Sequence, residues 1–372
     1  MRIRTSPKEK RSRQQATVIR RKLLAWYDLH HRQLPWRMTQ DPYRIWVSEV
    51  MLQQTRAQAV IPFYETFLLR FPTVDALADA KERDLLACWS GLGYYSRARN
   101  LQKAARVIVS QYEGLFPREL EEALALPGIG TYTAAAVLSI AYGIPLPVVD
   151  GNVARVLSRL FAMGADVRTN GGKQTLLKLA GELHSARRPG DFNQAMMELG
   201  ATICTPQQPQ CPICPLGKYC LAFSRNEVAK YPPLRRKEKP VVRLFVAALI
   251  MDGKGKCLLV RRPQDSRWMG GFWELPMNEG FAPDHSLLIS EAMSERGITL
   301  RTLLGRVRHT ITTNKLEVSV FQASLVRVAQ PRIEKWVSLR QINRLPVTTI
   351  TRKALRLADQ ERLARKPTLE IH

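Results

Sequence analysis

The sequence lacks any run of about 18 apolar residues, so it contains no candidate membrane span. Acidic residues are scarce, because 32 Asp and Glu stand against 57 Lys and Arg and leave a formal net charge of +25. This surplus indicates a polyanionic partner, either nucleic acid or an acidic membrane surface. Residues 1–22 are basic and lack the apolar core of a secretion signal. We therefore expect an intracellular, reducing setting, in which the six cysteines do not form disulfides by default.

The length of 372 residues predicts two or three domains. Residues 1–15 are expected to form a basic flexible tail, and phosphate binding is an equal alternative for them. Over residues 16–225 apolar side chains recur three and four positions apart, which predicts a helical domain. Prolines and basic residues at 226–240 indicate a linker. The pattern then changes and predicts a smaller α+β domain over residues 241–372.

The strongest patterns predict individual elements. In the first domain they predict helices at Thr17–His31, Tyr43–Ala57, Ala98–Tyr112, Tyr132–Tyr142 and Val153–Phe161. In the second they predict strands at Val241–Met251, Cys257–Arg261 and Glu317–Ala323, and helices at Ser286–Arg296 and Thr351–Leu363. The expected fold class is therefore mainly α, with a C-terminal α+β domain.

Four of the six cysteines lie in one short loop, with the spacing C-x6-C-x2-C-x5-C. They are Cys204, Cys211, Cys214 and Cys220. Four thiolates this close converge readily on one metal centre, either zinc or an iron–sulfur cluster. Zinc sites usually pair two C-x2-C knuckles, whereas this loop has one tight pair, so the spacing favours a [4Fe–4S] cluster. Four unrelated core cysteines are the remaining alternative.

A turn rich in glycine and proline, Leu126–Gly130, lies between two helical patterns. Gly128 and Gly130 let backbone N–H groups approach an anion closely, and the start of the next helix adds its positive dipole end. The turn is therefore either a grip on a backbone phosphate or a plain connector between two helices.

Two carboxylates are expected to have different surroundings. Asp150 stands just before a helical pattern, as an N-cap residue does, and helix N–H groups would hold its carboxylate ionised. Glu49 shares a helical face with Ile45 and Leu52, so its carboxyl group lies in an apolar stripe and should have a raised pKa. One protonated and one ionised carboxyl group form the arrangement that cleaves glycosidic bonds. The alternative is a core acid and an ordinary helix cap.

Together these motifs resemble the helix-hairpin-helix DNA glycosylase superfamily and, within it, the MutY-type adenine DNA glycosylases. The resemblance covers most of residues 22–220. The matching strings are LPWR (Leu34–Arg37), SEVMLQQT (Ser48–Thr55), GLGYYSRARNL (Gly91–Leu101), LPGIGTYTAAAV (Leu126–Val137), VDGNVARV (Val149–Val156), FNQAMMELGATIC (Phe192–Cys204) and the four-cysteine loop. The resemblance implies a base-excision-repair enzyme with a [4Fe–4S] cluster that removes adenine mispaired with 8-oxoguanine or guanine. We expect it to act as a monomer on double-stranded DNA in the cytoplasm, associated with the nucleoid and not with a membrane.

The resemblance also implies roles for single residues. Glu49 matches the general acid that protonates adenine, and Asp150 matches the carboxylate that stabilises the oxocarbenium-like sugar. Tyr132 matches the hairpin tyrosine of the catalytic group, and Asn152 matches an asparagine that supports the carboxylates. Adenine leaves poorly until it is protonated, and the sugar cation needs a fixed anion nearby, so these assignments agree with the chemistry.

Other matches imply contacts with substrate and DNA. Arg37 and Glu198 match residues that line the adenine pocket. Gln54 and Tyr94 match residues that fill or wedge the base stack around a flipped nucleotide, and flipping costs least at a mispair. Further expected contacts with substrate or DNA are Trp36, Leu52, Thr55, Leu92, Gly128 and Gly130.

The related endonuclease III-type enzymes carry a lysine in the hairpin, after the second glycine, which forms a Schiff base and cuts the strand. This chain has Tyr132 at the matching position, and tyrosine cannot form a Schiff base. We therefore expect a monofunctional glycosylase that leaves an abasic site.

The C-terminal domain resembles the Nudix-like module with which MutY-type enzymes recognise 8-oxoguanine. The string WMGGFWELP at residues 268–276 carries this resemblance. A working Nudix hydrolase needs a cluster of carboxylates to hold magnesium, and Ser290–Gly297 keeps only two of them. We expect this domain to read DNA rather than to hydrolyse nucleotides.

The family often presents a Phe-Ser-His loop to 8-oxoguanine, and the corresponding stretch here is Ile311-Thr312-Thr313. The hydroxyl groups of Thr312 and Thr313 would replace the serine contact. His309 is either a further reader of the base or an ordinary histidine near a strand end. Two other functions stay open from the sequence: a hydrolase of oxidised nucleotides and a DNA-damage binder without catalysis.

Overall fold

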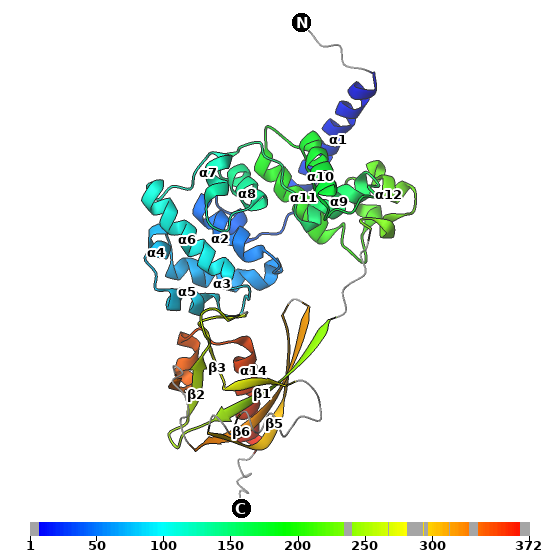
Figure 1. Cartoon of the computed structure of the whole chain (residues 1–372). Helices are drawn as coiled ribbons and strands as arrows, with labels where there is room; N and C mark the ends of the chain where they lie inside the picture. The colour runs from blue at the N-terminus through cyan, green and yellow to red at the C-terminus, as the bar shows by residue number, and fades with distance from the viewer. Residues whose placement is uncertain are drawn as a thin grey trace, which may run out of the picture. The chain divides into compact units, whose positions relative to one another are not determined.

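A computed structural model describes residues 7–233, 240–266, 268–280, 293, 297–311, 313–326 and 334–364. The chain folds into two compact units (Figure 1). Unit 1 comprises Met1–Asp79 and Arg99–Arg236, and unit 2 comprises Ala80–Ala98 and Lys237–His372. No helix in these described ranges has the length and apolar character needed to cross a membrane.

Unit 1 is helical. Its helices are α1 (Pro7–His30), α2 (Pro42–Leu52), α3 (Ala57–Arg70), α4 (Val74–Ala78), α6 (Ser96–Gln111, whose first residues are shared with unit 2), α7 (Leu120–Ala125), α8 (Thr131–Tyr142), α9 (Gly151–Leu160), α10 (Asn170–Leu183), α11 (Pro189–Thr202) and α12 (Leu221–Ser224). Short 3-10 helices occur at Pro35–Arg37, Cys211–Ile213, Gly217–Tyr219 and Val228–Lys230.

The predicted helices of this unit correspond to α1, α2, α6, α8 and α9; most ends differ by one or two residues, and two ends differ by more. The helix predicted over Tyr43–Ala57 ends at Leu52, because Gln53 leaves the helical region and Gln54 takes a φ of 58°. Helix α1 begins at Pro7, so it includes part of the stretch expected to be a flexible tail. Residues 1–6 lie outside the described residues.

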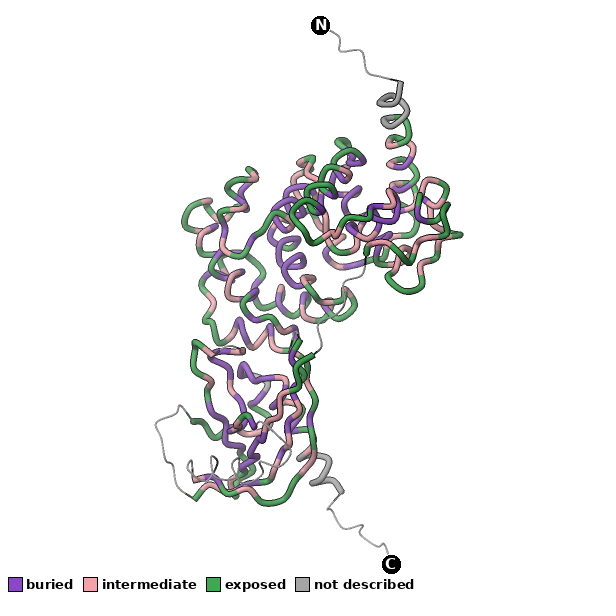
Figure 2. The backbone as a smooth tube through the Cα atoms, turned by 45° about the vertical axis from the view of Figure 1, so that its right-hand side comes forward, coloured by how far each residue is buried: buried purple, intermediate pink, exposed green. Residues whose placement is uncertain are grey.

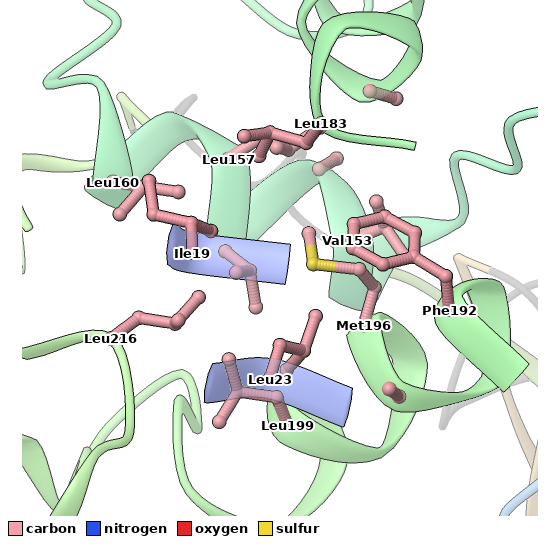
Figure 3. Packing of buried hydrophobic residues seen from close by; sticks show 14 of the residues in the cluster. Ile19, Leu23, Val153, Leu157, Leu160, Leu183, Phe192, Met196, Leu199 and Leu216 are labelled. Carbon is pink, nitrogen blue, oxygen red and sulfur yellow. The ribbon is translucent and has the colours of Figure 1, made fainter. Parts of the chain in front are cut away.

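The core beside the cysteine loop is formed by one apolar face of α9 (Figure 3). Fully burying a leucine or valine side chain contributes roughly 1.5–3 kcal/mol, so this cluster fixes α9 firmly against its neighbours. Because Leu216 belongs to the cysteine loop, the same cluster holds that loop against α9. Its labelled members are Val153, Leu157 and Leu160 of α9, Ile19 and Leu23 of α1, Leu183 of α10, Phe192, Met196 and Leu199 of α11, and Leu216.

Helix α8 is apolar around most of its circumference and packs against both α2 and α11. Its residues from Thr133 to Ser139 are all buried, as expected of a helix with neighbours on several sides. Tyr132 stands in the first turn of α8 and is therefore presented beside α2 and α11. Figure 2 shows how buried stretches alternate with exposed ones along the chain.

Unit 2 contains two small sheets. Strands β4, β1, β6 and β5 form one sheet in this order, with β1 parallel to β6 and the other pairs antiparallel, whereas β3, β2 and β7 form an antiparallel sheet. Helix α14 packs against β5. The elements are α5 (Glu82–Trp89), β1 (Val241–Ile250), β2 (Lys256–Arg261), β3 (Trp273–Glu274), β4 (Met277–Gly280), β5 (Ile298–Ile311), β6 (Asn314–Leu325), β7 (Glu334–Ser338) and α14 (Thr349–Ala364).

The predicted strands of this unit are confirmed as β1, β2 and β6, and the last predicted helix is α14. Strand β5 was not predicted, because Gly305, with a φ of 153°, and shifts in its pairing with β6 interrupt the alternation of side chains. Of the helix predicted over Ser286–Arg296, only Met293 is described, and it is buried among residues of β1 and β2.

The segment Ala80–Ala98 joins unit 2 through specific contacts. The Ser90 hydroxyl donates to the carbonyl oxygen of Val347 at 3.3 Å and accepts from Arg352 Nη2 at 3.2 Å. The Tyr95 ring packs against Phe272, with 4.1 Å between the ring centroids. Unit 2 is therefore an α+β fold completed by a helical segment from the first half of the chain.

Candidate active site

Glu49 lies on the buried face of α2 and is 4% exposed. The helix begins where the Asp41 side chain caps it by accepting two backbone N–H groups. Burial raises the pKa of Glu49 from 4.5 to about 7. The hydrogen bond from Tyr132 opposes this rise, the negative charge of Asp150 adds to it, and the positive charge of Arg37 opposes it. Glu49 is thus a carboxyl group that is half protonated near neutral pH.

Tyr132 connects the elements around Glu49. Its hydroxyl donates to Glu49 Oε2 at 2.7 Å and lies 3.4 Å from Met197 Sδ of α11. Burial raises the pKa of Tyr132 well above 10, and the nearby charges of Glu49 and Asp150 raise it further. The phenol therefore remains a neutral hydrogen-bond donor over the whole physiological range.

Asp150 caps α9, as the sequence predicts. Its Oδ1 accepts from the backbone N–H of Val153 at 2.7 Å, and its Oδ2 accepts from Asn152 Nδ2 at 3.0 Å. The pKa of Asp150 is nevertheless raised from 3.8, because burial outweighs these hydrogen bonds. The direction is the opposite of what capping alone would produce. Asp150, Asn152, Tyr132 and Glu49 thus lie together in unit 1, where the charges of Asp150 and Glu49 act on one another.

Arg155 fixes the side chain of Asn152 through a hydrogen bond to its amide oxygen. The sequence did not single out this arginine. Its Nη2 donates to Asn152 Oδ1 and to the carbonyl oxygen of Gly200, both at 2.8 Å, while its Nε donates to the carbonyl oxygen of Cys204 at 2.7 Å. The sequence could have pointed to Arg155, because it stands three residues after Asn152 in a predicted helix, and side chains at this spacing are neighbours. A Cβ atom on Gly200 would lie 2.6 Å from the Cβ of Asn152, so the close packing of α9 on α11 requires glycine.

Glu198 forms the second polar group of the site and is fully buried. Arg32 binds it with Nε at 2.7 Å from Oε1 and Nη2 at 2.8 Å from Oε2, and Arg37 Nη2 lies 2.8 Å from Oε2. Burial raises the pKa of Glu198, but the hydrogen bonds from the two arginines outweigh burial and lower it to about 2. Arg37 also lies over the Tyr27 ring, 5.6 Å from its centroid. Arg32 was missed, although it stands five residues before Arg37 as a second basic residue in the same stretch.

The glycine-rich turn connects α7 to α8. Gly128 has a φ of 78°, and a Cβ atom there would lie 2.6 Å from the Cβ of Asn100. Glycine is therefore required at this position both for its backbone conformation and for its contact with α6. Gly130 is the N-cap of α8 without a capping side chain, and no atom lies within 4 Å of where its Cβ would be.

The remaining candidates of unit 1 lie near the end of α2 and before it. Gln54 is exposed and adopts a positive φ in the turn after α2, while Thr55 closes this turn with its N–H bonded to the Leu52 carbonyl oxygen at 3.1 Å. Leu52 is half-buried. Trp36 is buried, with its ring packed edge-on against Tyr64.

Two candidates lie in the segment of unit 2 that follows α5. Tyr94 has a φ of 48° and is 42% exposed. Arg97 lies under it, 5.5 Å from its ring centroid, and at the same distance from the Trp89 ring. Leu92 is buried. An exposed aromatic ring at a strained backbone position is suited to insert into a base stack.

The predicted base-reading stretch is the turn between β5 and β6. Ile311 pairs with Asn314 across it, Thr313 is exposed, and Thr312 lies outside the described residues. His309 stands on β5 opposite Leu316 and is half-buried. Burial lowers the pKa of His309, and the nearby charge of Lys353 lowers it further, so its imidazole is neutral at pH 7.

The four cysteines of the loop Cys204–Cys220 line one cavity of about 30 Å³ together with Arg159. The Thr205 hydroxyl beside them is buried and has no partner in the described part of the chain. No group of three or more His, Cys, Asp or Glu among the described residues is placed to hold a metal ion, so any assignment depends on donor chemistry and the shared cavity. Four thiols around one cavity, with an orphaned hydroxyl next to them, fit a thiolate-ligated centre.

Comparison with known families identifies both parts of the chain. Residues 47–181 match the HhH-GPD superfamily of base excision DNA repair proteins. Residues 246–357 match the NUDIX domain family.

Comparison with individual proteins agrees with these matches. The chain is 35% identical to the adenine DNA glycosylase of Homo sapiens over 408 aligned residues, which cover 92% of this chain and 74% of the human protein. Among solved structures it is similar to a thermostable thymine-DNA glycosylase, with a TM-score of 0.53 and 31% identity, covering 57% of this chain and 98% of that one. It is also similar to endonuclease III in a non-covalent DNA complex, with a TM-score of 0.50 and 25% identity, covering 57% and 97% of the two chains.

Proposed function

Since the chain belongs to the adenine DNA glycosylases of base excision repair, we propose that it flips adenine out of a mispair with 8-oxoguanine or guanine and hydrolyses its N-glycosidic bond. The observation that carries the proposal is the hydrogen bond between Tyr132 and Glu49 beside the capping carboxylate Asp150. A DNA N-glycosylase needs one group to give a proton and one to stay charged. Glu49 is the group that gives the proton, and Asp150, whose oxygens accept hydrogen bonds from Val153 and Asn152, is the group that carries the charge in this proposal.

The proton comes from Glu49. A general acid works best when its pKa is near the working pH, and burial brings the pKa of Glu49 to about 7. The glycosidic bond breaks as adenine takes this proton, and positive charge develops on the sugar. Asp150 faces this charge, and Asn152 and the α9 N–H group at Val153 hold its two oxygens in place. Water then completes hydrolysis at the sugar and leaves an abasic site.

The adenine pocket is lined by Glu198 and Arg37. Glu198 is buried and its two oxygens already accept hydrogen bonds from Arg32 and Arg37, so its ionised carboxylate fixes the Arg37 guanidinium in place at the pocket. Trp36, next to Arg37 in the chain, is buried with its ring packed against Tyr64 and anchors this stretch of the pocket.

Exposed side chains at positive-φ positions are suited to enter a DNA base stack. In unit 1 this residue is Gln54, aided by Leu52 and Thr55; in unit 2, taken by itself, it is Tyr94, aided by Leu92. The turn with Gly128 and Gly130 binds a backbone phosphate through its N–H groups and the start of α8. Thr312, Thr313 and His309 read the base opposite adenine, and the chain acts as a monomer.

The four loop cysteines would hold a [4Fe–4S] cluster. When bound, this cluster would cross-link the loop through its four cysteines and place a negative charge in their shared cavity. The loop itself is packed on α9 through Leu216 and reaches Asn152 through the contact of Arg155 with the Cys204 carbonyl oxygen. A loop of this kind fixes α9, and with it Asp150, relative to α11.

Single-turnover release of adenine from duplexes with A opposite 8-oxoguanine, G, C or T tests the substrate. Release opposite 8-oxoguanine and guanine, and little opposite C or T, is expected. Equal release from all four would refute reading of the opposite base, and magnesium-dependent release of pyrophosphate from oxidised nucleotides would favour a hydrolase. Tyr132→Lys tests the monofunctional assignment: it should gain strand cleavage, whereas Tyr132→Phe should not.

A further inference from the structure

Arg159 is a buried cation next to the cysteine loop. It lies on α9 and is 3% exposed. Its guanidinium donates to three carbonyl oxygens, those of Tyr231 from Nε at 3.0 Å, of Thr205 from Nη1 at 2.7 Å and of Pro206 from Nη2 at 3.1 Å. These bonds use most of its N–H groups and fix the plane of the guanidinium.

The same guanidinium reaches a sulfur atom. Its Nη1 lies 3.3 Å from Cys204 Sγ, and the backbone carbonyl oxygen of Arg159 lies 3.3 Å from Cys220 Sγ. Arg159 also lines the cavity that the four cysteines share. One residue therefore contacts two of the four thiols, through its side chain and its main chain.

The positive charge of Arg159 has no carboxylate partner in the described part of the chain, where its contacts are carbonyl oxygens and sulfur. An arginine remains protonated in proteins, so burying it without an anion is costly. Arg155, one turn earlier on α9, adds a second positive charge beside the loop, since its Nε donates to the Cys204 carbonyl oxygen at 2.7 Å. One buried and one half-buried cation beside neutral thiols would be an unstable arrangement, whereas beside thiolates they would be compensated.

We propose that Arg159 is the counter-ion of the metal–thiolate centre and donates a charge-assisted hydrogen bond to the Cys204 thiolate. This rests on the proposed iron–sulfur cluster, in which four thiolates outweigh the positive charge of the iron–sulfide core. A fixed cation stabilises the electron-rich state of the cluster more than its oxidised state, so Arg159 raises the reduction potential and protects the cluster from oxidation.

Variants that separate charge from hydrogen bonding test this role on the full-length protein without DNA. Arg159→Lys keeps the charge, whereas Arg159→Gln keeps an N–H donor and loses the charge. Lys218→Gln is the matched control, because it removes an exposed positive charge from the same loop. The readouts are iron content, the absorption band near about 400 nm, the midpoint potential by voltammetry, and the rate at which ferricyanide removes one electron from the cluster.

In R159Q the equilibrium between the reduced and the oxidised cluster should shift about tenfold toward the oxidised form. This is the scale of one charge-assisted hydrogen bond. Ferricyanide should also oxidise the R159Q cluster faster than the parent cluster. R159K and K218Q should keep a potential close to that of the parent protein. If R159Q purifies without iron, the midpoint potential of R159K tests the proposal instead. A potential of R159K equal to that of the parent protein supports the counter-ion role, and a lower potential overturns it. A loaded R159Q with the parental potential also overturns it. A parent protein without iron or the absorption band refutes the cluster itself, which is a separate failure.

Discussion

Replacing Glu49 with glutamine should stabilise the fold at neutral and alkaline pH while removing the acid that we propose for catalysis. The pKa of Glu49 rises from 4.5 to about 7 when it is buried. Below pH 4.5 the carboxyl group is protonated in both the folded and unfolded states, so it costs nothing. As pH rises from 4.5 to 7 the unfolded state gives up its proton first, and the folded state becomes progressively less stable. Each unit of pKa difference corresponds to about 1.4 kcal/mol, so the loss in the free energy of unfolding reaches about 3 kcal/mol above pH 7.

Glutamine has no such ionisation and can still accept the hydrogen bond of Tyr132. Urea denaturation at several pH values should therefore show that the advantage of E49Q over the parent grows from near zero at about pH 4 to about 3 kcal/mol at about pH 8. Glu65→Gln, at an exposed position on α3, controls for the loss of one surface carboxylate. An advantage that does not grow with pH would refute the reasoning about the buried acid.

Three further predictions follow from the site and the charge. Gly200→Ala should cost about 1–3 kcal/mol of stability and slow base release, because the new methyl group pushes Asn152 away from Asp150; unchanged denaturation midpoints would contradict this. Glu198→Gln should cost about 3–5 kcal/mol in urea denaturation by leaving two arginines with a weaker partner, whereas Asp28→Asn, in an exposed pair, should cost at most about 1 kcal/mol. Duplex affinity should fall by at least about tenfold between about 50 and 200 mM salt, and titrations that show no salt dependence would argue against a phosphate-binding surface.

Part of the site could be predicted because it depends on local spacing. Glu49 lies among apolar residues at helical intervals, so its burial on α2 follows from the pattern alone. Asp150 precedes a helix, and capping follows from this position. The raised pKa of Asp150 could not be predicted in the same way, since it depends on burial by parts of the chain remote in sequence.

Contacts between distant residues were beyond prediction from the sequence. Arg32 meets Glu198 and Arg159 meets Cys204 across long stretches of chain, and no local pattern specifies such pairs. In unit 2 the strand β5 was missed because Gly305 and its shifted register break the alternation that marks strands. The grouping of residues 80–98 with unit 2 depends on contacts such as that of Tyr95 with Phe272.

The central claim is that a proton held on Glu49 at neutral pH departs with adenine. The most direct measurement is the single-turnover rate of adenine release from an A:8-oxoguanine duplex as a function of pH. The parent rate should be flat below pH 7 and fall about tenfold for each further pH unit, while E49Q releases no adenine at any pH. Release by E49Q at the parent rate, or a parent rate that rises with pH, would contradict the account.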